Sequence, residues 1–579
     1  MKLEAIYHRP KLNWSYMYDE DTVHIRLRTK RNNIDSVNVM AGDKYEFQAT
    51  LTAIPMRILA SDALFDYWEA AVTTKNWRLQ YYFQLKKGSK QIYMDETEFS
   101  RKPPQNAIGI FEFPYLHAND MLKPPQWVKD AVFYQIFLDR FANGDKSNDP
   151  ASTERWGGKP QQDNYFGGDL QGVIDHLDHL SSLGVNAIYF NPIFQAMTNH
   201  KYDTQDYMSI DQQFGTNELM KVFVDACHAR GIRVLLDAVF NHSGKTFAPF
   251  VDVLKKGEAS IYKDWFHVEE FPLQVKNGKP TYRAFAFEPH MPKLNTQNPE
   301  VKLYLLDVAR YWMEEIGIDG WRIDVANEVD HQFFRDFRQV VKQVDEQAYI
   351  LGEIWHDSMM WLQGDQFDAV MNYPFTNAVL DFFAHRKINA EQFSNRISYQ
   401  LSAYPLTVNE VAFNLLDSHD TPRLLTLCKE NKSIMKLAAL FQLTFLGAPC
   451  IYYGDEIGLT GGADPDCRKC MEWEKPKQDQ DLFAFYQEMI SLRKGHEALR
   501  TGAFRFKHAR KGDNVIVYER TNDSECFIIM MNNSHKPGIV SVQLERGQWS
   551  NPLSSDIMTV TGEAVQIDLP AYGYAIWKQ

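Results

Sequence analysis

Cysteine is scarce in this sequence, with six residues among 579. That number is too small for a disulfide framework of the kind that stabilises small secreted domains. Cys467 and Cys470 form one CxxC pair, but a zinc site would need a second pair nearby, and the sequence has none. A redox CxxC would follow a short strand in a small domain, which does not fit this segment, so the spacing is interpreted as chance.

Long hydrophobic runs and an excess of positive charge are also missing. The first residues, MKLEAIYHRPKLNW, contain no apolar segment of signal-peptide length, and no later run is long enough to span a bilayer. The formal net charge is −13, which argues against a nucleic-acid or anionic-membrane partner because both require a basic face. We therefore expect a cytoplasmic protein with neither a nucleic-acid nor a membrane partner.

Glycine-rich phosphate loops of the GxGxxG or GxxxxGKS/T type do not occur either. From Trp127 onward, short apolar segments alternate with longer helical stretches, and eight such units in series predict an α/β fold, a closed (β/α)8 TIM barrel. The alternative is an open doubly wound sheet, which would usually carry a phosphate loop after an early strand. The candidate strands are 131–138, 187–194, 233–240, 320–326, 348–354, 367–374, 411–417 and 448–456.

Strand-rich segments flank the predicted barrel. Stretches such as TVHIRLRTK alternate apolar and polar residues, which predicts a β-sandwich domain up to the proline pair in LKPPQW. The connection of about sixty residues after the third barrel strand is long enough for a small inserted domain. The predicted domains are an N-terminal β-sandwich at 1–121, a barrel at 122–500 with an insertion at about 243–299, and a C-terminal β-sandwich at 501–579.

Charged side chains follow several of the predicted barrel strands, and the chemistry of a barrel sits at these carboxyl ends. A single aspartate at a strand end is more often a helix cap than a catalytic residue. By themselves, Arg322 and Asp324 are explained equally well by a structural ion pair and by a functional site. Three carboxylates, however, converge from separate strands: Asp324, Glu353 and Asp420. Bringing like charges together costs free energy, so such a cluster indicates a function. This set suits glycoside hydrolysis, which needs one protonated and one ionised carboxyl group.

The stretches DAVFNH, GWRIDVANE, GEIW and LLDSHD resemble the catalytic motifs of the α-amylase family of glycoside hydrolases. MPKLN, at 291–295, and VANE resemble its cyclomaltodextrinase, neopullulanase and maltogenic amylase subgroup, and the resemblance covers essentially the whole chain. It implies a retaining α-glucan hydrolase that cleaves α-1,4 bonds through a covalent glycosyl-enzyme intermediate and is open to transglycosylation. The implied substrates are cyclomaltodextrins (cyclodextrins), pullulan, short maltooligosaccharides and starch.

The resemblance also implies roles for individual residues. Asp324 matches the nucleophile, and Arg322 on the same strand face is expected to keep it ionised by lowering its pKa. Glu353 matches the general acid/base, and Asp420 matches the carboxylate that binds sugar hydroxyls and supports the transition state. The matching sugar-binding residues are His242, Arg322, His419, Asp464, Arg468, Tyr202 and Trp355, with Phe285 as a further stacking candidate.

A second polar cluster lies in FANGDKSNDP, at 141–150, where oxygen-bearing side chains are close in sequence. Its spacing is not that of an EF-hand, and a polar turn is the plain alternative. In several members of the family, this loop and FGGDL hold a structural calcium ion, which the resemblance therefore implies here. The matching metal ligands are Asn143, Asp145, Asn148, Asp149, Gly167 and Asp169.

The N-terminal domain is long and rich in aromatic residues although the barrel chemistry does not require it. The resemblance implies a homodimer in which this domain covers the partner's active site, with Tyr45 as the residue expected to reach it.

Two other hypotheses about function use the same scaffold. One is a non-catalytic transporter subunit or carbohydrate-binding protein, which the three carboxylates and the lack of a membrane span disfavour. The other is an isomerase or glucanotransferase, which the sequence does not separate from a hydrolase.

Overall fold

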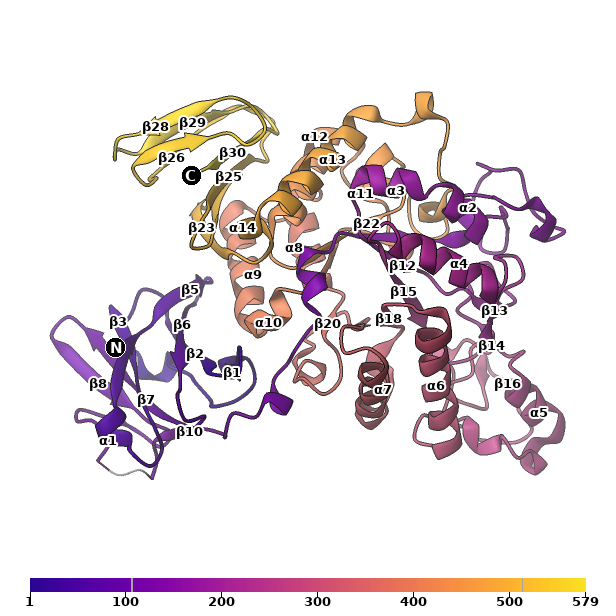
Figure 1. The fold of residues 1–579 in the computed structure, drawn as a ribbon, viewed down its shortest axis with the longest axis horizontal. Coiled ribbons are helices and arrows are strands. Elements are labelled where there is room, and N and C mark those ends of the chain that lie inside the picture. The colour runs from indigo at the N-terminus through magenta and orange to yellow at the C-terminus, as the bar shows by residue number, and fades with distance from the viewer. Residues whose placement is uncertain (106–107, 513) are drawn as a thin grey trace.

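The computed structural model describes residues 1–105, 108–512 and 514–579. The remaining positions fall within the predicted N-terminal and C-terminal domains and lie outside the described residues. A central barrel carries two β-domains on one side, with the N-terminal domain beside α9 and α10 and the C-terminal domain beside α12 and α14 (Figure 1). Among the described residues, no helix is long and apolar enough to cross a membrane.

Eight parallel strands form the barrel sheet in the order β20-β19-β18-β15-β12-β11-β22-β21, and a bridge between Met371 and Phe413 closes it. The strands are buried on both faces, which explains their continuous apolar sequences. Closure confirms the predicted barrel and excludes the open sheet. The strands are β11 Phe133–Ile136, β12 Ala187–Phe190, β15 Arg233–Ala238, β18 Gly320–Ile323, β19 Tyr349–Gly352, β20 Ala369–Val370, β21 Phe413–Leu415 and β22 Ala448–Tyr452.

Helices on the outside connect most of these strands, and several begin at polar side-chain caps such as Thr216, Asp330 and Asn389. The described connection from β19 to β20 has a short 3₁₀ turn, Met359–Trp361, in place of an α-helix. The barrel helices are α2 Leu170–Asp175, α3 Leu177–Leu183, α4 Asn217–His228, α6 Pro299–Tyr311, α7 His331–Val344, α8 Tyr373–Phe383, α9 Ala390–Ala403, α10 Leu406–Asn409, α11 Leu424–Leu427, α12 Lys432–Thr444, α13 Gln480–Gly495 and α14 Glu497–Arg500.

Two excursions extend the carboxyl-terminal side of the barrel. The first is a hairpin after β12, formed by β13 Phe194–Ala196 and β14 Thr204–Ile210. The second is the predicted insertion after β15, which contains α5 Ala248–Lys256 and the hairpin of β16 Val275–Lys276 and β17 Lys279–Pro280. This insertion returns to the barrel mouth, where Lys293 pairs with His242 as an isolated bridge.

The N-terminal domain is a sandwich of two antiparallel sheets, β1-β2-β6-β5 and β4-β3-β7-β8-β9, with β10 also paired to β7. Buried Arg26 joins it to the barrel by donating to the carbonyl oxygens of Ser402 at 3.2 Å and Tyr404 at 2.6 Å. Its elements are β1 Ser15–Met17, β2 Thr22–Lys30, β3 Ser36–Gly42, α1 Phe47–Thr50, β4 Thr52–Pro55, β5 Arg57–Ser61, β6 Phe65–Thr73, β7 Leu79–Lys87, β8 Lys90–Met94, β9 Phe99–Ser100 and β10 Phe111–Phe113.

The C-terminal domain has a larger sheet, β23-β24-β25-β30-β27-β28, and a smaller one, β26-β29, with its own apolar core. Asn533 ties it to the barrel by donating to the carbonyl oxygen of Phe382 at 2.7 Å. Its strands are β23 Ala503–Ala509, β24 Val515–Thr521, β25 Cys526–Asn532, β26 Gly538–Val542, β27 Gly547–Ser550, β28 Ile557–Val560, β29 Val565–Leu569 and β30 Tyr574–Lys578.

Candidate active site

The fully buried Arg322 guanidinium is the centre of the acidic cluster at the barrel mouth. Its Nη1 lies 2.8 Å from an oxygen of Asp324 and 2.8 Å from an oxygen of Asp237. Its Nη2 lies 2.8 Å from Oε2 of Glu353. Strand register explains this meeting, because Asp237 on β15 is directly opposite Arg322 on β18. One cation is therefore shared by three carboxyl groups that come from three neighbouring strands.

The backbone after Asp324 adopts an unusual conformation. Strand β18 ends at Ile323, and Val325 has a φ of 44°, in the left-handed region that a β-branched residue rarely occupies. Its amide donates to Oε2 of Glu353 at 3.1 Å, while the indole of Trp355 donates to Oε1 at 3.2 Å. The strained turn thus gives Glu353 a backbone donor and holds its carboxyl group beside Asp324.

The electrostatics of the cluster differ from the sequence expectation. Burial raises the pKa of Asp324 well above its usual range, Arg322 opposes this, and the neighbouring carboxyl groups of Glu353 and Asp237 add to it. Burial likewise raises the pKa of Asp237 to about 6 against the pull of Arg322. Arg322 does act to lower the pKa of Asp324, as expected, but burial outweighs it. The prediction of a lowered pKa for Asp324 was therefore wrong. The cluster therefore retains protons that isolated carboxyl groups would lose.

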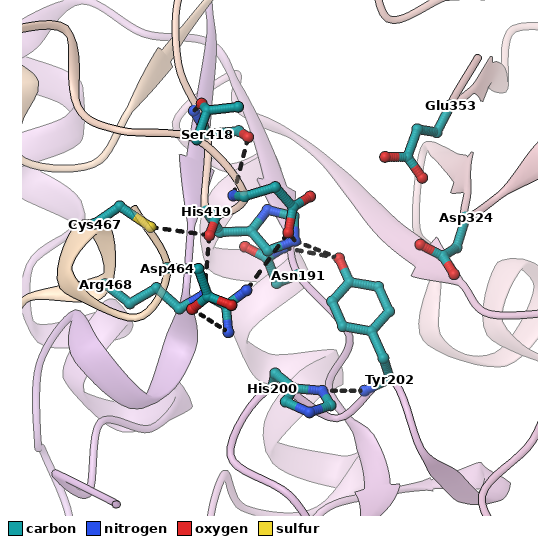
Figure 2. Close-up of polar contacts among 12 residues, drawn as sticks. Asn191, His200, Tyr202, Asp324, Glu353, Ser418, His419, Asp464, Cys467 and Arg468 are labelled. Carbon is teal, nitrogen blue, oxygen red and sulfur yellow. Dashed lines mark hydrogen bonds and ion pairs between the residues drawn. The ribbon is translucent and has the colours of Figure 1, made fainter. Parts of the chain in front are cut away.

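On the opposite side of the mouth lies a second group built around His419 (Figure 2). The Tyr202 hydroxyl lies 2.8 Å from Nε2 of His419, and the two rings stack with centroids 5.6 Å apart. The side-chain amide of Gln135 lies 2.9 Å from Nδ1. Burial, with the nearby cation of Arg468, lowers the pKa of His419 well below its usual range, so the ring is neutral. A neutral ring that accepts from Gln135 carries its proton on Nε2, toward Tyr202 and Asp420.

Asp420 and Arg468 complete this side of the site. Oδ1 of Asp420 lies 3.2 Å from Nε2 of His419 and 3.5 Å from Nη2 of Arg468. Nη1 of Arg468 lies 3.1 Å from Oδ1 of Asp464. Although its side chain is partly exposed, desolvation by the surrounding protein raises the pKa of Asp420, and the positive charges of Arg468 and Arg322 oppose this rise. Asp464 and Arg468 thus form an ion pair that faces the mouth.

The two groups face one cavity of about 520 Å³. His242 contributes to it with a buried Nε2 that has no hydrogen-bond partner in the described ranges, and with its ring stacked on Phe285 at 5.2 Å between centroids. Burial and Lys293 lower the pKa of His242 to about 3, so it is neutral. Half-exposed Trp355 stacks on Tyr373 at 3.8 Å. The lining residues are Gln162, His200, Tyr202, His242, Phe285, Met291, Asp324, Val325, Asn327, Glu353, Trp355, Asp420, Asp464 and Arg468.

All the predicted catalytic and sugar-binding residues meet at this cavity, except that Arg322 and His419 lie directly behind its wall. Sequence reasoning did not assign five further lining residues to the site: Gln162, His200, Met291, Val325 and Asn327. Met291 lies in MPKLN, and Val325 and Asn327 lie in VANE, so these two motifs held a signal for three of them. The register of β15 and β18 also makes Asp237 a direct partner of Arg322, a role that its position in DAVFNH alone did not indicate.

The predicted metal ligands also lie together, away from the cavity. The side-chain amide of Asn143 donates to Asp149 at 2.7 Å, and the backbone of Asp145 donates to Asp169 at 2.7 Å. The side-chain oxygens of Asn143 and Asn148 are buried and have no hydrogen-bond partner among the residues that the structure describes. A hypothetical Cβ on Gly167 would lie 2.1 Å from Asp149, so only glycine fits this close approach.

These unpartnered oxygens fit a hard cation such as calcium. Within the described ranges, no three histidine, cysteine or acidic side chains are grouped closely enough to hold a metal by themselves. The amide oxygens and the Gly167 carbonyl would therefore have to supply much of the coordination.

Three family models match successive parts of the chain. They are the alpha amylase N-terminal ig-like domain at residues 1–117, the alpha amylase catalytic domain at 135–502 and the maltogenic amylase C-terminal domain at 504–576. The chain belongs to the α-amylase family. The catalytic-domain match spans all eight strands except the first two residues of β11, so the acidic cluster lies within this domain.

Similar proteins place this α-amylase family member more closely. A cyclomaltodextrinase from Bacillus sp is 59% identical over 560 residues, which cover 96% of this chain and 100% of the relative. An intracellular maltogenic amylase from Bacillus subtilis (strain 168) is 45% identical over 551 residues, 94% and 93% of the two chains. A solved cyclomaltodextrinase structure matches with a TM-score of 0.96, 57% identity and complete coverage of both chains.

These relatives confirm the subgroup indicated by MPKLN and VANE. The protein is a glycoside hydrolase of the cyclomaltodextrinase, neopullulanase and maltogenic amylase type, and it acts on α-glucans.

Proposed function

We propose that the protein hydrolyses α-1,4 bonds of cyclomaltodextrins, and also of pullulan, short maltooligosaccharides and starch, with retention of configuration. The observation that carries this proposal is the shared guanidinium of Arg322, which lies 2.8 Å from both Asp324 and Glu353. It keeps the two carboxyl groups close, as retaining enzymes require, whereas inverting enzymes separate them by roughly 6.5–9.5 Å to admit a water molecule.

In the proposed mechanism, Glu353 protonates the leaving glycosidic oxygen while Asp324 attacks the anomeric carbon. Before attack, Arg322 stabilises the ionised form of Asp324. As Asp324 bonds the anomeric carbon and Glu353 gives up its proton, the negative charge passes to Glu353, whose carboxyl group also lies 2.8 Å from Arg322. Asp420 and the neutral His419 and His242 bind sugar hydroxyls and favour the distorted, oxocarbenium-like transition state. Glu353 then removes a proton from water, or from a sugar hydroxyl in transglycosylation, to release the covalent intermediate.

The names of the relatives support the substrate assignment. The Bacillus sp relative is a cyclomaltodextrinase, and it spans nearly the whole of this chain. A cytoplasmic location is proposed from the Bacillus subtilis relative, which is named as intracellular.

Incubation with β-cyclodextrin, pullulan and soluble starch, followed by product separation, tests the substrate assignment. Linear maltooligosaccharides from β-cyclodextrin are expected, whereas products formed only by rearrangement, with no gain in reducing ends, would indicate an isomerase or glucanotransferase.

A structural calcium ion is proposed at the cluster formed by Asn143, Asp145, Asn148, Asp149, Gly167 and Asp169. The buried oxygens of Asn143 and Asn148 that lack a partner support it. Asp169 already caps α2 through the amide of Gly172 at 2.6 Å, so it would link the ion to the start of this helix. The ion would brace the loop after β11, and the reaction would not pass through it because the carboxyl groups supply all of the chemistry.

A homodimer is proposed in which the N-terminal domain of one subunit covers the active site of the other. Two observations support this arrangement. The described lining of the cavity comes from the barrel and its insertion, and Tyr45 projects from the N-terminal domain with 73% of its surface exposed. A narrowed mouth would admit a small ring and hinder a branched polymer.

Sedimentation at micromolar concentration should give twice the 67.3 kDa chain mass. Tyr45→Ala should lower the preference for β-cyclodextrin over starch severalfold, and Tyr45→Phe should retain it because the ring is kept. A monomer with the same strong preference would contradict the proposed arrangement.

A further inference from the structure

The carbonyl oxygen of His419 accepts two side-chain donors from a single turn. The Cys467 thiol donates to it with an Sγ–O distance of 3.1 Å, and Nε of Arg468 donates at 2.9 Å. Figure 2 shows both contacts converging on His419, across the mouth from Asp324. The carbonyl oxygen that accepts them belongs to the peptide that joins His419 to Asp420. Cys467 was interpreted from sequence as half of a chance CxxC pair, yet it lies behind the sugar-binding side of the cavity.

The position of Asp420 depends mainly on this peptide. Its side chain is 35% exposed, and within the described part of the chain its carboxyl group has only long contacts, with His419 at 3.2 Å and Arg468 at 3.5 Å. Its backbone amide donates to the hydroxyl of Ser418 at 3.2 Å. Because the carboxyl group is weakly held by its neighbours, a rotation of the peptide would move it relative to a bound sugar. The two donors to the His419 carbonyl oppose that rotation.

Cys467 is itself held rigidly from the other side. The carbonyl oxygen of Cys467 accepts from Nε of buried Arg423 at 2.9 Å and from the hydroxyl of Tyr452 at 3.4 Å. Arg423 also donates to the carbonyl oxygen of Tyr453 at 2.7 Å, which anchors it just beyond the end of β22. Burial raises the pKa of the Cys467 thiol to about 12, so the thiol keeps its proton and can donate.

We propose that Cys467 is a positioning residue for the reaction, and that its thiol holds the His419–Asp420 peptide in the orientation that the transition state requires. The chain of contacts runs from the barrel wall through Arg423 to the turn at Cys467, and from the thiol to the two sugar-binding residues. The inference rests on the proposed function, because it assumes that His419 and Asp420 bind the sugar at the cleaved bond.

The test compares three variants of the full-length enzyme with β-cyclodextrin as substrate. Cys467→Ala removes the donor, Cys467→Ser keeps one, and Cys227→Ala removes an equally buried thiol on α4 as a matched control. One neutral hydrogen bond corresponds to a change of roughly threefold to tenfold, so kcat/KM should fall by about that factor in Cys467→Ala. We expect most of the loss to appear in kcat, and Cys467→Ser to recover at least half of it.

A purely structural role would lower thermal stability without this pattern. Inhibition by 1-deoxynojirimycin, a cationic sugar mimic, provides a second reading, and its Ki in Cys467→Ala should rise by the same factor as kcat/KM falls. Unchanged kcat/KM in Cys467→Ala, an equal loss in Cys227→Ala, or an equal loss in Cys467→Ser would overturn the proposal.

If Cys467→Ala does not fold, Cys467→Ser decides the question, and a drop in its kcat/KM beyond tenfold would overturn the proposal. Absence of α-glucan hydrolysis by the unmodified enzyme would instead refute the proposed function.

Discussion

Two buried arginines, Arg26 in the N-terminal domain and Arg322 in the barrel, have very different acidic surroundings. Arg26 faces Glu69 at 2.7 Å, and its other donors reach backbone carbonyl groups and a tyrosine hydroxyl. Arg322 instead faces the carboxyl groups of Asp237, Asp324 and Glu353, each at 2.8 Å. The Arg26 cluster therefore pairs one guanidinium with one carboxyl group, whereas the Arg322 cluster has three carboxyl groups for one guanidinium.

The pKa values follow this difference. Burial disfavours the charged form of Glu69, but Arg26 and His24 outweigh it and lower the pKa of Glu69 to about 2. In the Arg322 cluster, burial prevails and raises the pKa of Asp237 to about 6. A matched pair with a lowered carboxyl pKa stabilises the fold, while surplus carboxyl groups that retain protons are prepared for proton transfer. This contrast separates the structural interpretation of Arg322 from the catalytic one.

The largest effect is expected at the acid-rich cluster. Asp324→Asn should lower kcat on β-cyclodextrin by about four decades or more, equivalent to ~5.5 kcal/mol of barrier, because the amide cannot act as the nucleophile. Removing one of three like charges should not lower the melting temperature. Steady-state kinetics and thermal unfolding check both parts. A variant with a tenth of the original activity would show that Asp324 is not the nucleophile.

Glu353→Gln should produce a smaller loss that depends on the leaving group. On β-cyclodextrin, removal of the acid should cost a factor of about 10² to 10⁴. On an aryl maltoside with an activated leaving group, the formation of the intermediate should suffer much less. Pre-steady-state measurement of aryl release distinguishes this step from hydrolysis of the intermediate. Equal losses with both substrates would argue against proton donation by Glu353.

Glu69→Gln should show the opposite behaviour at the Arg26 cluster. A pKa lowered from 4.5 to about 2 corresponds to about 3 kcal/mol of stability. This contribution is fully present above pH 4.5 and is lost as the pH falls through about 2. Denaturant unfolding should therefore separate the variant from the unmodified protein at pH 7 and bring them together near pH 2. Below the unfolding temperature, kcat of the variant should stay within about twofold of the original value. A large loss of kcat would contradict a purely structural role for the Arg26 cluster.

Calcium removal should have the smallest effect, on stability rather than chemistry. A ligand at a hundred times its Kd contributes about 2.7 kcal/mol, so EDTA should lower the melting temperature and added calcium should restore it. Asn143→Ala should weaken the response, because it removes one of the buried unpartnered oxygens. An unchanged melting temperature together with no metal in elemental analysis would rule out a structural calcium ion at this cluster.

Much of the molecule was predictable because periodicity reports which face of a segment is buried. The eight barrel strands and the convergence of Asp324, Glu353 and Asp420 follow from apolar segments and from the polar residues at their ends. Other features depend on packing between distant segments. Examples are the left-handed Val325, the net pKa direction of Asp324 and the contact between Cys467 and His419. Sequence spacing carries no information on these contacts or on the extent of burial.

Covalent labelling shows whether the acid-rich Arg322 cluster performs retaining hydrolysis with Asp324 as nucleophile. A 5-fluoro-α-maltosyl fluoride reacts quickly but releases slowly, so the glycosyl-enzyme should accumulate and survive peptide mass spectrometry. We expect one 5-fluoromaltosyl label, located on Asp324 in the peptide that contains GWRIDVANE. A label on any other carboxyl group would contradict this assignment.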